Sequence, residues 1–354
     1  MKKVFIFIIL SLVLVGCNKK EQGIKIENKE EIKQEEVKEL TGEDYQNNKV
    51  DELGEVPIMM YHGIHYKNNS DTEYTGGNVD KNGYQRTTEA FINDLEFYYN
   101  EGYRMIRLTD YVDGKIDVEL GKSPIILTFD DGLSNNIKVT GLDENGEIII
   151  DPNSAVGILE SFKEKYPDYN VTATFFVNGG LFEQKEYNEK ILKWMVDNGY
   201  DIGNHTYSHV DFTNVDNEKT EEEIGKVYEI LDKIIPEKYV NIVALPFGSP
   251  YSLDHNNMSY ILNTNYNNKT YETKSSLRVG WKAESSPFSK KFNPKFLKRI
   301  RAYDNNGEEF DIEMNFKLLE NNRYISDGDL NIVVIPEVKK DELGDNLQKD
   351  VKTY

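Results

Sequence analysis

The sequence predicts an α/β fold built on a mainly parallel sheet, either open or closed into a barrel. Short apolar runs alternate with amphipathic stretches of helical period, which is the pattern of strand and helix repeats around a parallel sheet. Polar clusters follow several of the apolar runs, and functional groups of such folds gather where strands end. About 300 residues follow a polar N-terminal segment, a length suited to one large domain.

The elements are predicted from the period of the apolar residues and from the turn residues that bound them. The predicted strands are residues 56–62, 104–108, 124–130, 171–177, 201–205, 240–245 and, near the end, 331–335. The predicted helices are residues 87–102, 154–166, 187–199 and one that begins with the capping-box pattern Thr220-x-x-Glu223. Residues 251–275 are rich in Asn, Ser and Tyr and predict a long surface excursion. The charged residues 336–354 predict a tail that is partly disordered.

The N-terminus predicts export and lipid anchoring. Lys2 and Lys3 precede an apolar run of about a dozen residues, which is too short to span a bilayer comfortably and typical of a signal peptide. The run ends in Leu-Val-Gly-Cys17, which resembles the bacterial lipobox, so residues 1–16 are expected to be cleaved and Cys17 lipidated. An ordinary secretory signal with an incidental cysteine is the alternative. Cys17 is the only cysteine, which excludes a disulfide and a thiolate metal site.

The composition of the chain excludes two classes of binding partner. Residues 17–50 are mostly charged and amide side chains and predict a flexible tether. The formal charge is −20, and removal of Lys2 and Lys3 with the signal would make it about −22. Such a chain is unsuited to nucleic acid or anionic lipid headgroups, whereas a neutral glycan is compatible with it.

Two motifs predict a metal-dependent active site. Thr-Phe-Asp130-Asp131-Gly closes an apolar strand, and adjacent carboxylates at a strand end repel each other unless a cation or proton separates them. His205 and His209 are four residues apart, a spacing that places both on one face of a helical turn. One Asp with the two His would give three ligands and open positions, which is a catalytic rather than a structural arrangement.

These motifs resemble those of the polysaccharide deacetylases of carbohydrate esterase family 4, also called the NodB-like homology domain. The resemblance implies a distorted (β/α)7-type barrel with one divalent metal, most often Zn²⁺, although Co²⁺, Ni²⁺ or Fe²⁺ also suit such ligands. It assigns Asp130 as general base and Asp131, His205 and His209 as metal ligands. The substrate it implies is a cell-surface polysaccharide of N-acetylglucosamine type, either peptidoglycan or poly-N-acetylglucosamine.

The chain departs from the family pattern in its third, fourth and last motifs. The third motif reads Ala-Leu-Pro-Phe247-Gly, so the Arg that orients the base is missing, although the Phe247 N–H remains available to an oxyanion. The nearest match to the fourth motif contains Trp281, which is expected either to line the acetyl pocket or to be plain core. The C-terminal His that supplies the acid is absent, and Arg299 or Arg301 is a candidate for the missing Arg.

The missing acid is expected at the front of the domain. Met-Tyr-His62 follows the first predicted strand and resembles a circularly permuted branch of the family that includes poly-N-acetylglucosamine deacetylases. His62 would then be the acid, with His65 a less favoured alternative. Further segments resemble one branch of secreted Gram-positive deacetylases, so that the resemblance covers about residues 54–330; they are residues 121–124, 203–206, 285–288, 299–301 and 324–328.

The sequence therefore predicts a catalytic domain over residues 51–335, held on the extracellular face of a Gram-positive type cell membrane. Three long insertions are expected to shape the substrate groove: residues 68–84, 138–153 and 252–274. Their tyrosines are candidates for stacking on sugar rings, namely Tyr74, Tyr84, Tyr251, Tyr260 and Tyr266. Two alternatives remain open, an O-acetyl esterase and a glycan-binding lipoprotein without turnover.

Overall fold

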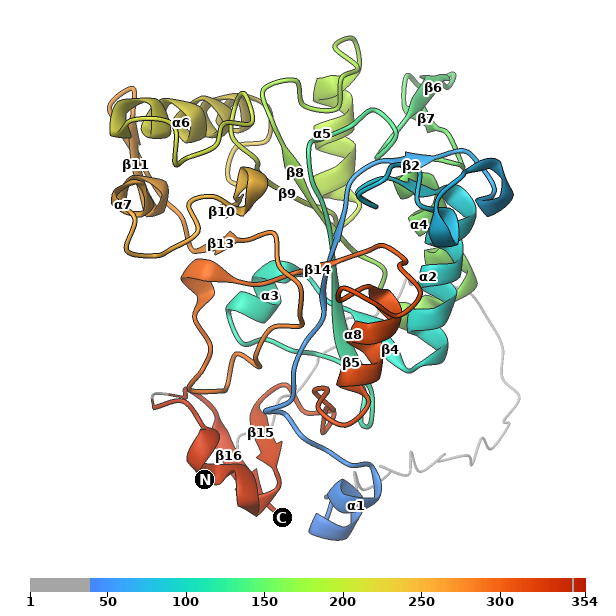
Figure 1. The fold of residues 1–354 in the computed structure, drawn as a ribbon, viewed down its shortest axis with the longest axis vertical. Helices are drawn as coiled ribbons and strands as arrows, with labels where there is room; N and C mark the ends of the chain where they lie inside the picture. Colours follow the sequence, from blue (N-terminus) through green and yellow to red (C-terminus); the bar gives the residue numbers. More distant parts are fainter. Residues whose placement is uncertain (1–38, 346) are drawn as a thin grey trace, which may run out of the picture. The chain divides into compact units, whose positions relative to one another are not determined.

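A curled, eight-stranded parallel sheet forms the centre of the computed structural model, which describes residues 39–345 and 347–354 (Figure 1). The strand order is β13-β10-β9-β8-β5-β1-β14, and β4 pairs with β5 outside this path. The strands are β1 (Ile58–Tyr61), β4 (Tyr103–Met105), β5 (Ser123–Phe129), β8 (Thr174–Val177), β9 (Asp201–Asn204), β10 (Ile242–Ala244), β13 (Ser275–Leu277) and β14 (Ile300–Arg301). The α/β fold with a parallel sheet is thus confirmed.

The first strand occupies the interior of the sheet, between β5 and the last strand β14. Met60 is in register with Thr128 on one side and with Arg301 on the other. A parallel bridge between Leu277 and Leu297 links the β13 end of the sheet to the segment that precedes β14. The carboxyl ends of β1, β5, β9 and β14 therefore lie at one end of the sheet, with β8 between β5 and β9. Circular permutation stays a prediction.

Helices surround this sheet, which is why its strands are buried on both faces and read as continuous apolar runs. The helices are α1 (Gly42–Asn47), α2 (Thr88–Asn100), α3 (Leu108–Val112), α4 (Ala155–Lys165), α5 (Asn188–Asp197), α6 (Asn217–Ile234), α7 (Asn256–Leu262) and α8 (Ile312–Leu319). Short 3-10 helices are η1 (Asn69–Asp71), η2 (Thr75–Gly77), η3 (Pro167–Tyr169), η4 (Pro246–Gly248), η5 (Pro294–Phe296) and η6 (Glu337–Glu342).

Four two-stranded sheets decorate the central one. β2 (Ile64–His65) pairs in parallel with β3 (Arg86–Thr87), and β15 (Ile332–Ile335) pairs in parallel with β16 (Asp350–Thr353). Two hairpins are antiparallel: β6 (Val139–Leu142) with β7 (Ile148–Ile150), and β11 (Asn263–Tyr266) with β12 (Lys269–Glu272). In the part of the chain that the structure describes, no helix is both long and apolar enough to cross a membrane.

The predicted start of α6 is wrong. The side chain of Asp216 accepts a hydrogen bond from the Lys219 N–H at 2.8 Å and caps a helix that begins at Asn217. Thr220 lies within the first turn, and its hydroxyl donates to the Asp216 carbonyl at 2.8 Å. Glu223, the partner in the expected capping box, is fully buried and bonds to a neighbouring loop.

Two segments expected to be irregular are folded. Residues 251–275 contain α7 and the β11–β12 hairpin, both of which pack on α6. The expected charged tail contains η6 and β16, and β16 pairs with a strand whose Val333, Val334 and Ile335 are buried. At the other end, the expected tether overlaps the fold, because Tyr45 and Val50 are buried against Val334. Cys17 lies outside the described residues.

Candidate active site

The turn that follows β5 carries the first residues of the candidate site. Asp131 and Gly132 both have positive φ, at 74° and 60°, so the chain bends sharply after the buried Asp130. A Cβ at position 132 would lie 2.3 Å from the carbonyl oxygen of Leu181, so only glycine fits. This bend turns the two adjacent carboxylates in different directions, one into the fold and one toward the loop after β9.

The two histidines lie in a loop, and the predicted helical turn is wrong. Thr206 and His209 have positive φ, at 65° and 55°, which no helix contains. The loop is fixed from α6: the Glu223 carboxylate accepts from the Ser208 N–H and hydroxyl at 2.7 Å each. The side-chain oxygen of Asn204 accepts a further hydrogen bond from the Thr206 N–H at 2.9 Å. Side-chain bonds of this kind compete with helix and hold the loop that presents both rings.

Asp131, His205 and His209 come together as the resemblance implies. Asp131 Oδ1 lies 3.3 Å from His205 Nε2 and 3.5 Å from His209 Nε2. The ligand atoms of all three residues lie within 4.8 Å of one another. Two imidazoles and one carboxylate form the donor set of a catalytic zinc-type site.

The hydrogen bonding of His205 fits a metal ligand. His205 Nδ1 donates to the Ala244 carbonyl at 2.9 Å, which leaves a lone pair on Nε2. That Nε2 is buried and has no hydrogen-bond partner among the described residues. A buried nitrogen that faces a carboxylate oxygen but makes no hydrogen bond is the arrangement expected of a residue that ligates a cation. The residues present therefore fit a divalent metal ion.

Arg299 takes the place of the missing third-motif arginine. Its Nη1 and Nη2 donate to the two oxygens of Asp130 at 2.7 Å each, and both side chains are buried. The guanidinium is itself held, because Nε donates to the Arg278 carbonyl at 2.9 Å and Nη1 to Thr128 Oγ1 at 3.1 Å. The geometry thus selects Arg299 over Arg301. No signal in the sequence distinguished the two.

His62 follows β1 beside Asp130, and its backbone is fixed. Its carbonyl accepts from Asn136 Nδ2 at 2.7 Å, and its ring packs edge-on against Tyr84 with centroids 5.1 Å apart. Its Nδ1 is buried and without a hydrogen-bond partner in the described part of the chain. His65, by contrast, is bonded to Gln85 at 3.0 Å, a structural role between β2 and its surroundings.

The ionisation of the site follows from burial and the ion pairs. Burial alone would raise the pKa of Asp130, but the Arg299 guanidinium, and then His205, hold it well below its usual range. Burial also opposes ionisation of Asp131, yet the adjacent His205 lowers its pKa. Burial lowers the pKa of His62, although the Asp130 and Asp131 carboxylates act against it. Both carboxylates are therefore ionised at neutral pH.

Phe247 lies beside the metal-ligand cluster, and Trp281 is exposed. Phe247 occupies the η4 turn with φ of 58°, and its exposed ring meets the His209 ring edge-on at 4.6 Å. Its N–H has no backbone partner among the described residues, as the predicted oxyanion role requires. Trp281 is 60% exposed, which excludes the plain-core alternative. None of the ring contacts of the described residues joins Trp281 to the cluster, so its pocket role stays a prediction.

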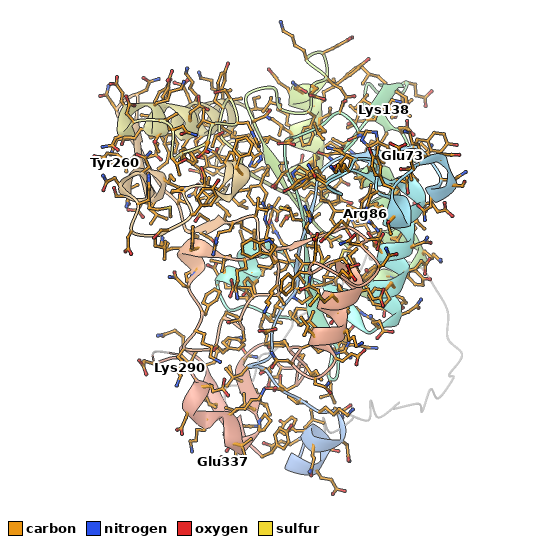
Figure 2. The ribbon with its side chains drawn as sticks, in the orientation of Figure 1. Glu73, Arg86, Lys138, Tyr260, Lys290 and Glu337 are labelled. Atoms are coloured by element: carbon orange, nitrogen blue, oxygen red, sulfur yellow. The ribbon has the colours of Figure 1, made fainter. Side chains whose placement is uncertain are left out.

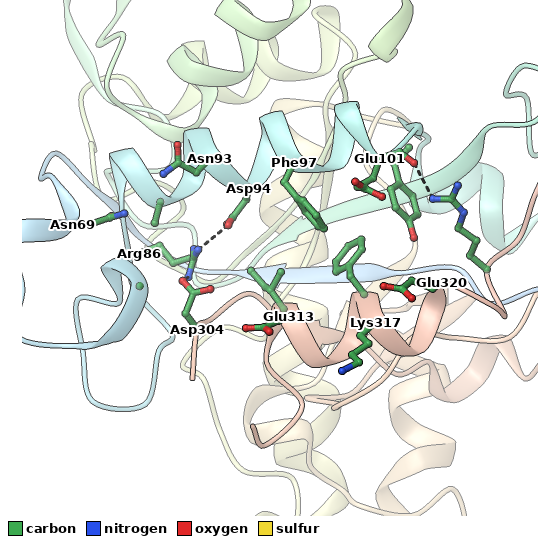
Figure 3. Close-up of a pocket in the computed structure, with 16 residues that line it drawn as sticks. Asn69, Arg86, Asn93, Asp94, Phe97, Glu101, Asp304, Glu313, Lys317 and Glu320 are labelled. Atoms are coloured by element: carbon green, nitrogen blue, oxygen red, sulfur yellow. Dashed lines mark hydrogen bonds and ion pairs between the residues drawn. The ribbon is translucent and has the colours of Figure 1, made fainter. Parts of the chain in front are cut away.

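A cavity of about 570 Å³ lies elsewhere, between α2 and α8 (Figure 3). Arg86 lies at one end of it, ion-paired with Asp94 at 2.7 Å and with Asp304 at 3.0 Å. These groups neutralise one another, and burial, partly offset by Arg86, raises the pKa of Asp94 to about 6. The apolar middle of the cavity is formed by rings that belong to the core, and the metal-ligand cluster is not part of its lining.

Comparison with known proteins agrees with this geometry. Residues 117–267 match the family model of polysaccharide deacetylases. A peptidoglycan-N-acetylglucosamine deacetylase of Bacillus cereus is 33% identical over 113 residues, which span 32% of this chain and 32% of that protein. The structure of a Streptococcus pyogenes deacetylase, PplD in complex with acetate, shares the fold with a TM-score of 0.52 and 19% identity, over 74% of this chain and 98% of that one. His62 and Arg299 lie outside residues 117–267, the range that the family model matches, so their roles are inferred from their contacts in the structure. Residues 117–267 are thus similar to polysaccharide deacetylases, and the chain spans about a third of the length of the curated relative that it matches.

Proposed function

We propose that this protein is a metal-dependent N-deacetylase of a cell-surface polysaccharide of the N-acetylglucosamine type. The observation that carries the proposal is the pairing of a three-residue ligand set with an ionised general base. Asp131, His205 and His209 face one point, and Asp130 beside them is held by Arg299. A glycan-binding protein without turnover has no need of this second feature. The missing arginine motivated that alternative, and Arg299, the residue just before β14, supports its replacement.

A divalent cation held by Asp131, His205 and His209 would polarise the acetyl carbonyl and make a nearby water more acidic. The chain's own residues supply the proton transfers. The Asp130 carboxylate accepts a proton as water attacks the carbonyl carbon, and its bidentate bonds to Arg299 keep it ionised and oriented. The Phe247 N–H would donate to the developing oxyanion. His62 then gives a proton to the leaving amine nitrogen, which releases acetate and a free amino sugar.

Burial lowers the pKa of His62, so this ring is neutral at neutral pH. The proton that it gives to the amine is then the one that Asp130 takes from the attacking water, and at the end of the reaction His62 is neutral and Asp130 ionised again. The nearby Asp130 and Asp131 charges favour that protonated form. A neutral imidazole that becomes charged next to two carboxylates suits an acid that acts late, after the tetrahedral intermediate has formed.

Location at the membrane belongs to the same proposal. The lipobox-like sequence before Cys17 supports a lipid anchor, and the peptidoglycan-directed relative supports a substrate in the cell wall. Radioactive palmitate incorporation that is lost on Cys17→Ser tests the anchor. If the wild-type chain takes up no labelled palmitate, the conclusion is that it is secreted without a lipid anchor.

The test of activity is acetate release from N-acetylglucosamine oligomers and from peptidoglycan, with and without added Zn²⁺ or Co²⁺. We expect metal-dependent release that is lost in Asp130→Asn and in His62→Ala. Release that survives His62→Ala would remove the acid assignment and leave the enzyme. Release only from O-acetylated glycans would support an O-acetyl esterase, and failure to bind any metal would favour the glycan-binding alternative.

A further inference from the structure

A polar cavity of about 430 Å³ has Arg301 in its lining, and Arg301 contacts Tyr84, whose ring packs against that of His62. It is formed between residues 73–82, which belong to the first long insertion, and residues 301–309, which follow β14. Figure 2 labels Glu73, one of the residues at its rim. The residues that matter for recognition are Tyr74, Asn78, Lys81, Arg301, Tyr303 and Asn305.

The two walls of the cavity are bonded to each other. The buried Asn78 donates through Nδ2 to the Asp304 carbonyl at 2.8 Å and accepts through Oδ1 from the Asp304 N–H at 3.2 Å. Arg86 reaches the same Asp304 through an ion pair at 3.0 Å. These bonds join segments more than two hundred residues apart in the sequence, so the cavity is a built feature of the fold.

A ladder of side chains connects this cavity to the proposed acid. Arg301 is in register with Met60, two residues before His62, at the end of the sheet where the catalytic groups lie. Its guanidinium carbon lies 3.8 Å from the ring centroid of Tyr303 and 5.2 Å from that of Tyr84. The Tyr84 ring in turn contacts the His62 ring at 5.1 Å. A polymer that has its acetamide group at His62 and extends along Tyr84 would therefore reach Arg301.

Arg301 is oriented but not neutralised. The two tyrosine rings hold its guanidinium through cation–π contacts, yet within the described residues the group has no hydrogen bond to a side chain or carbonyl and no ion pair. The buried Arg86 and Arg299, by contrast, are each bonded to carboxylates. A planar guanidinium whose faces are covered by rings presents its N–H edges, the geometry that binds a carboxylate through two parallel bonds.

The acidic residues around the cavity do not meet this charge. Asp304 is bound by Arg86, while Glu73 and Glu309 are exposed at the rim. The exposed Lys81 adds a second cation to the lining, and among the described residues it has no ion pair. Among the described residues the lining therefore holds two cations and two carboxylates without ion pairs. Arg301, held in place by two rings with its N–H edges free, is the group that favours an anionic ligand.

We propose that this cavity is a subsite for a carboxylate carried by the polymer next to the sugar that is deacetylated, with Arg301 as the specificity-determining residue. The inference rests on the proposed deacetylase function and narrows its substrate to an acidic glycan. The carboxylate has two possible sources, a lactyl ether on the adjacent sugar or a peptide attached to it. An uncharged homopolymer of N-acetylglucosamine would leave Arg301 without a partner.

The test compares matched oligosaccharides with the purified full-length protein. The first substrate carries free lactyl carboxylates on alternate sugars, the second the same groups as methyl amides, and the third a short peptide ending in a carboxylate. Acetate release gives kcat and KM for each. We expect kcat/KM to be about tenfold or more higher for a carboxylate substrate than for the methyl amide, because a hydrogen bond to a charged group contributes that much. The preferred arm identifies the source.

Arg301→Gln should bring the carboxylate-to-amide ratio of kcat/KM close to one, mainly through KM. Arg301→Lys should keep part of the preference, since it retains the charge without the planar fork. Arg323→Gln is the matched control: Arg323 also lies over a tyrosine ring, Tyr103, but belongs to the other cavity, and the ratio should not change.

Absence of a carboxylate preference in the wild type, or a preference that survives Arg301→Gln in protein with unchanged thermal unfolding, would overturn the proposal. Binding of the carboxylate and methyl amide substrates is measured in parallel by calorimetry. If no substrate releases acetate although binding shows the Arg301-dependent preference, the deacetylase function fails and the subsite stands. If acetate is released without that preference, the subsite fails and the function stands.

Discussion

Replacing Arg299 tests the arrangement on which the proposed chemistry depends. Arg299→Met removes both 2.7 Å bonds to Asp130 and leaves a carboxylate whose side chain is 2% exposed without a counter-charge. Removing one partner of a buried ion pair costs about 3–5 kcal/mol, a large part of the stability of a typical domain. The Asp130 carboxyl would also take up a proton more readily, since burial, the largest influence on its pKa, would act with less opposition. We therefore expect a stability loss of about that size and a kcat reduced at least a hundredfold, the usual contribution of a general base.

Urea unfolding and acetate release measure the two effects on the same preparation. Asp130→Asn combined with Arg299→Met removes both charges, so the double variant should lose less stability than Arg299→Met alone. Arg299→Lys should be intermediate, because a single ammonium cannot bond both oxygens and also reach the Arg278 carbonyl. An Arg299→Met protein with kcat within about threefold of wild type would refute the reasoning, as would unfolding that is unaffected.

Three further predictions concern groups around the site and in the core. His62→Ala should lower kcat for N-acetyl substrates more than for O-acetyl esters, because an amine needs a proton to leave and an alkoxide needs less help. Glu223→Gln should weaken metal binding about tenfold or more, since its carboxylate fixes the loop that carries His205 and His209. Burial and then the Asp327 carboxylate raise the pKa of Glu52 from 4.5 to about 8, so the folded state holds this proton more tightly than the unfolded chain. The stability it contributes is complete below pH 4.5 and is lost as the pH rises toward 8, at up to about 1.4 kcal/mol per pH unit, and Glu52→Gln should remove that slope.

Each of these has a matched control. His65→Ala removes a histidine bonded to Gln85 and should leave the amide-to-ester ratio unchanged. Glu222→Gln alters the neighbouring half-exposed carboxylate, which bonds to two lysines, and should leave the metal dissociation constant as it is. Equal effects of the Glu222 and Glu223 changes would remove the anchoring role. Unfolding free energies of wild type and Glu52→Gln that run parallel between pH 5 and pH 8 would contradict the assignment of that slope.

The sheet and the ligand set were predictable because their signals are local. β5 was expected over residues 124–130 and spans Ser123–Phe129, since a strand covered on both faces reads as an uninterrupted apolar run. Asp131, His205 and His209 were expected to meet because they follow strands of one parallel sheet. The spacing of the two His was also consistent with a helix, and the choice between helix and loop was made elsewhere, by the carboxylate of Glu223.

The role of Arg299 could not be predicted from local sequence patterns. It contacts Asp130 across 169 residues, and its role depends on β14 lying next to β1, which no local pattern encodes. The predicted start of α6 was wrong for a different reason. Two residues suited to an N-cap lie about one turn apart, and Asp216 is the N-cap in place of Thr220. The prediction of a disordered C-terminal tail was wrong because its charged residues were taken to indicate disorder. An exposed edge strand such as β16 is also commonly charged.

The direction of β1 has a consequence for where this chemistry takes place. The described chain enters the fold at α1, beside β15 and Tyr354, and then passes through β1, which ends one residue before His62 (Figure 1). Entry point and active site therefore lie at opposite poles of the domain. The point at which the chain enters the domain is thus kept apart from the groups that would meet a substrate, so a change at α1 is not expected to reach the catalytic groups directly.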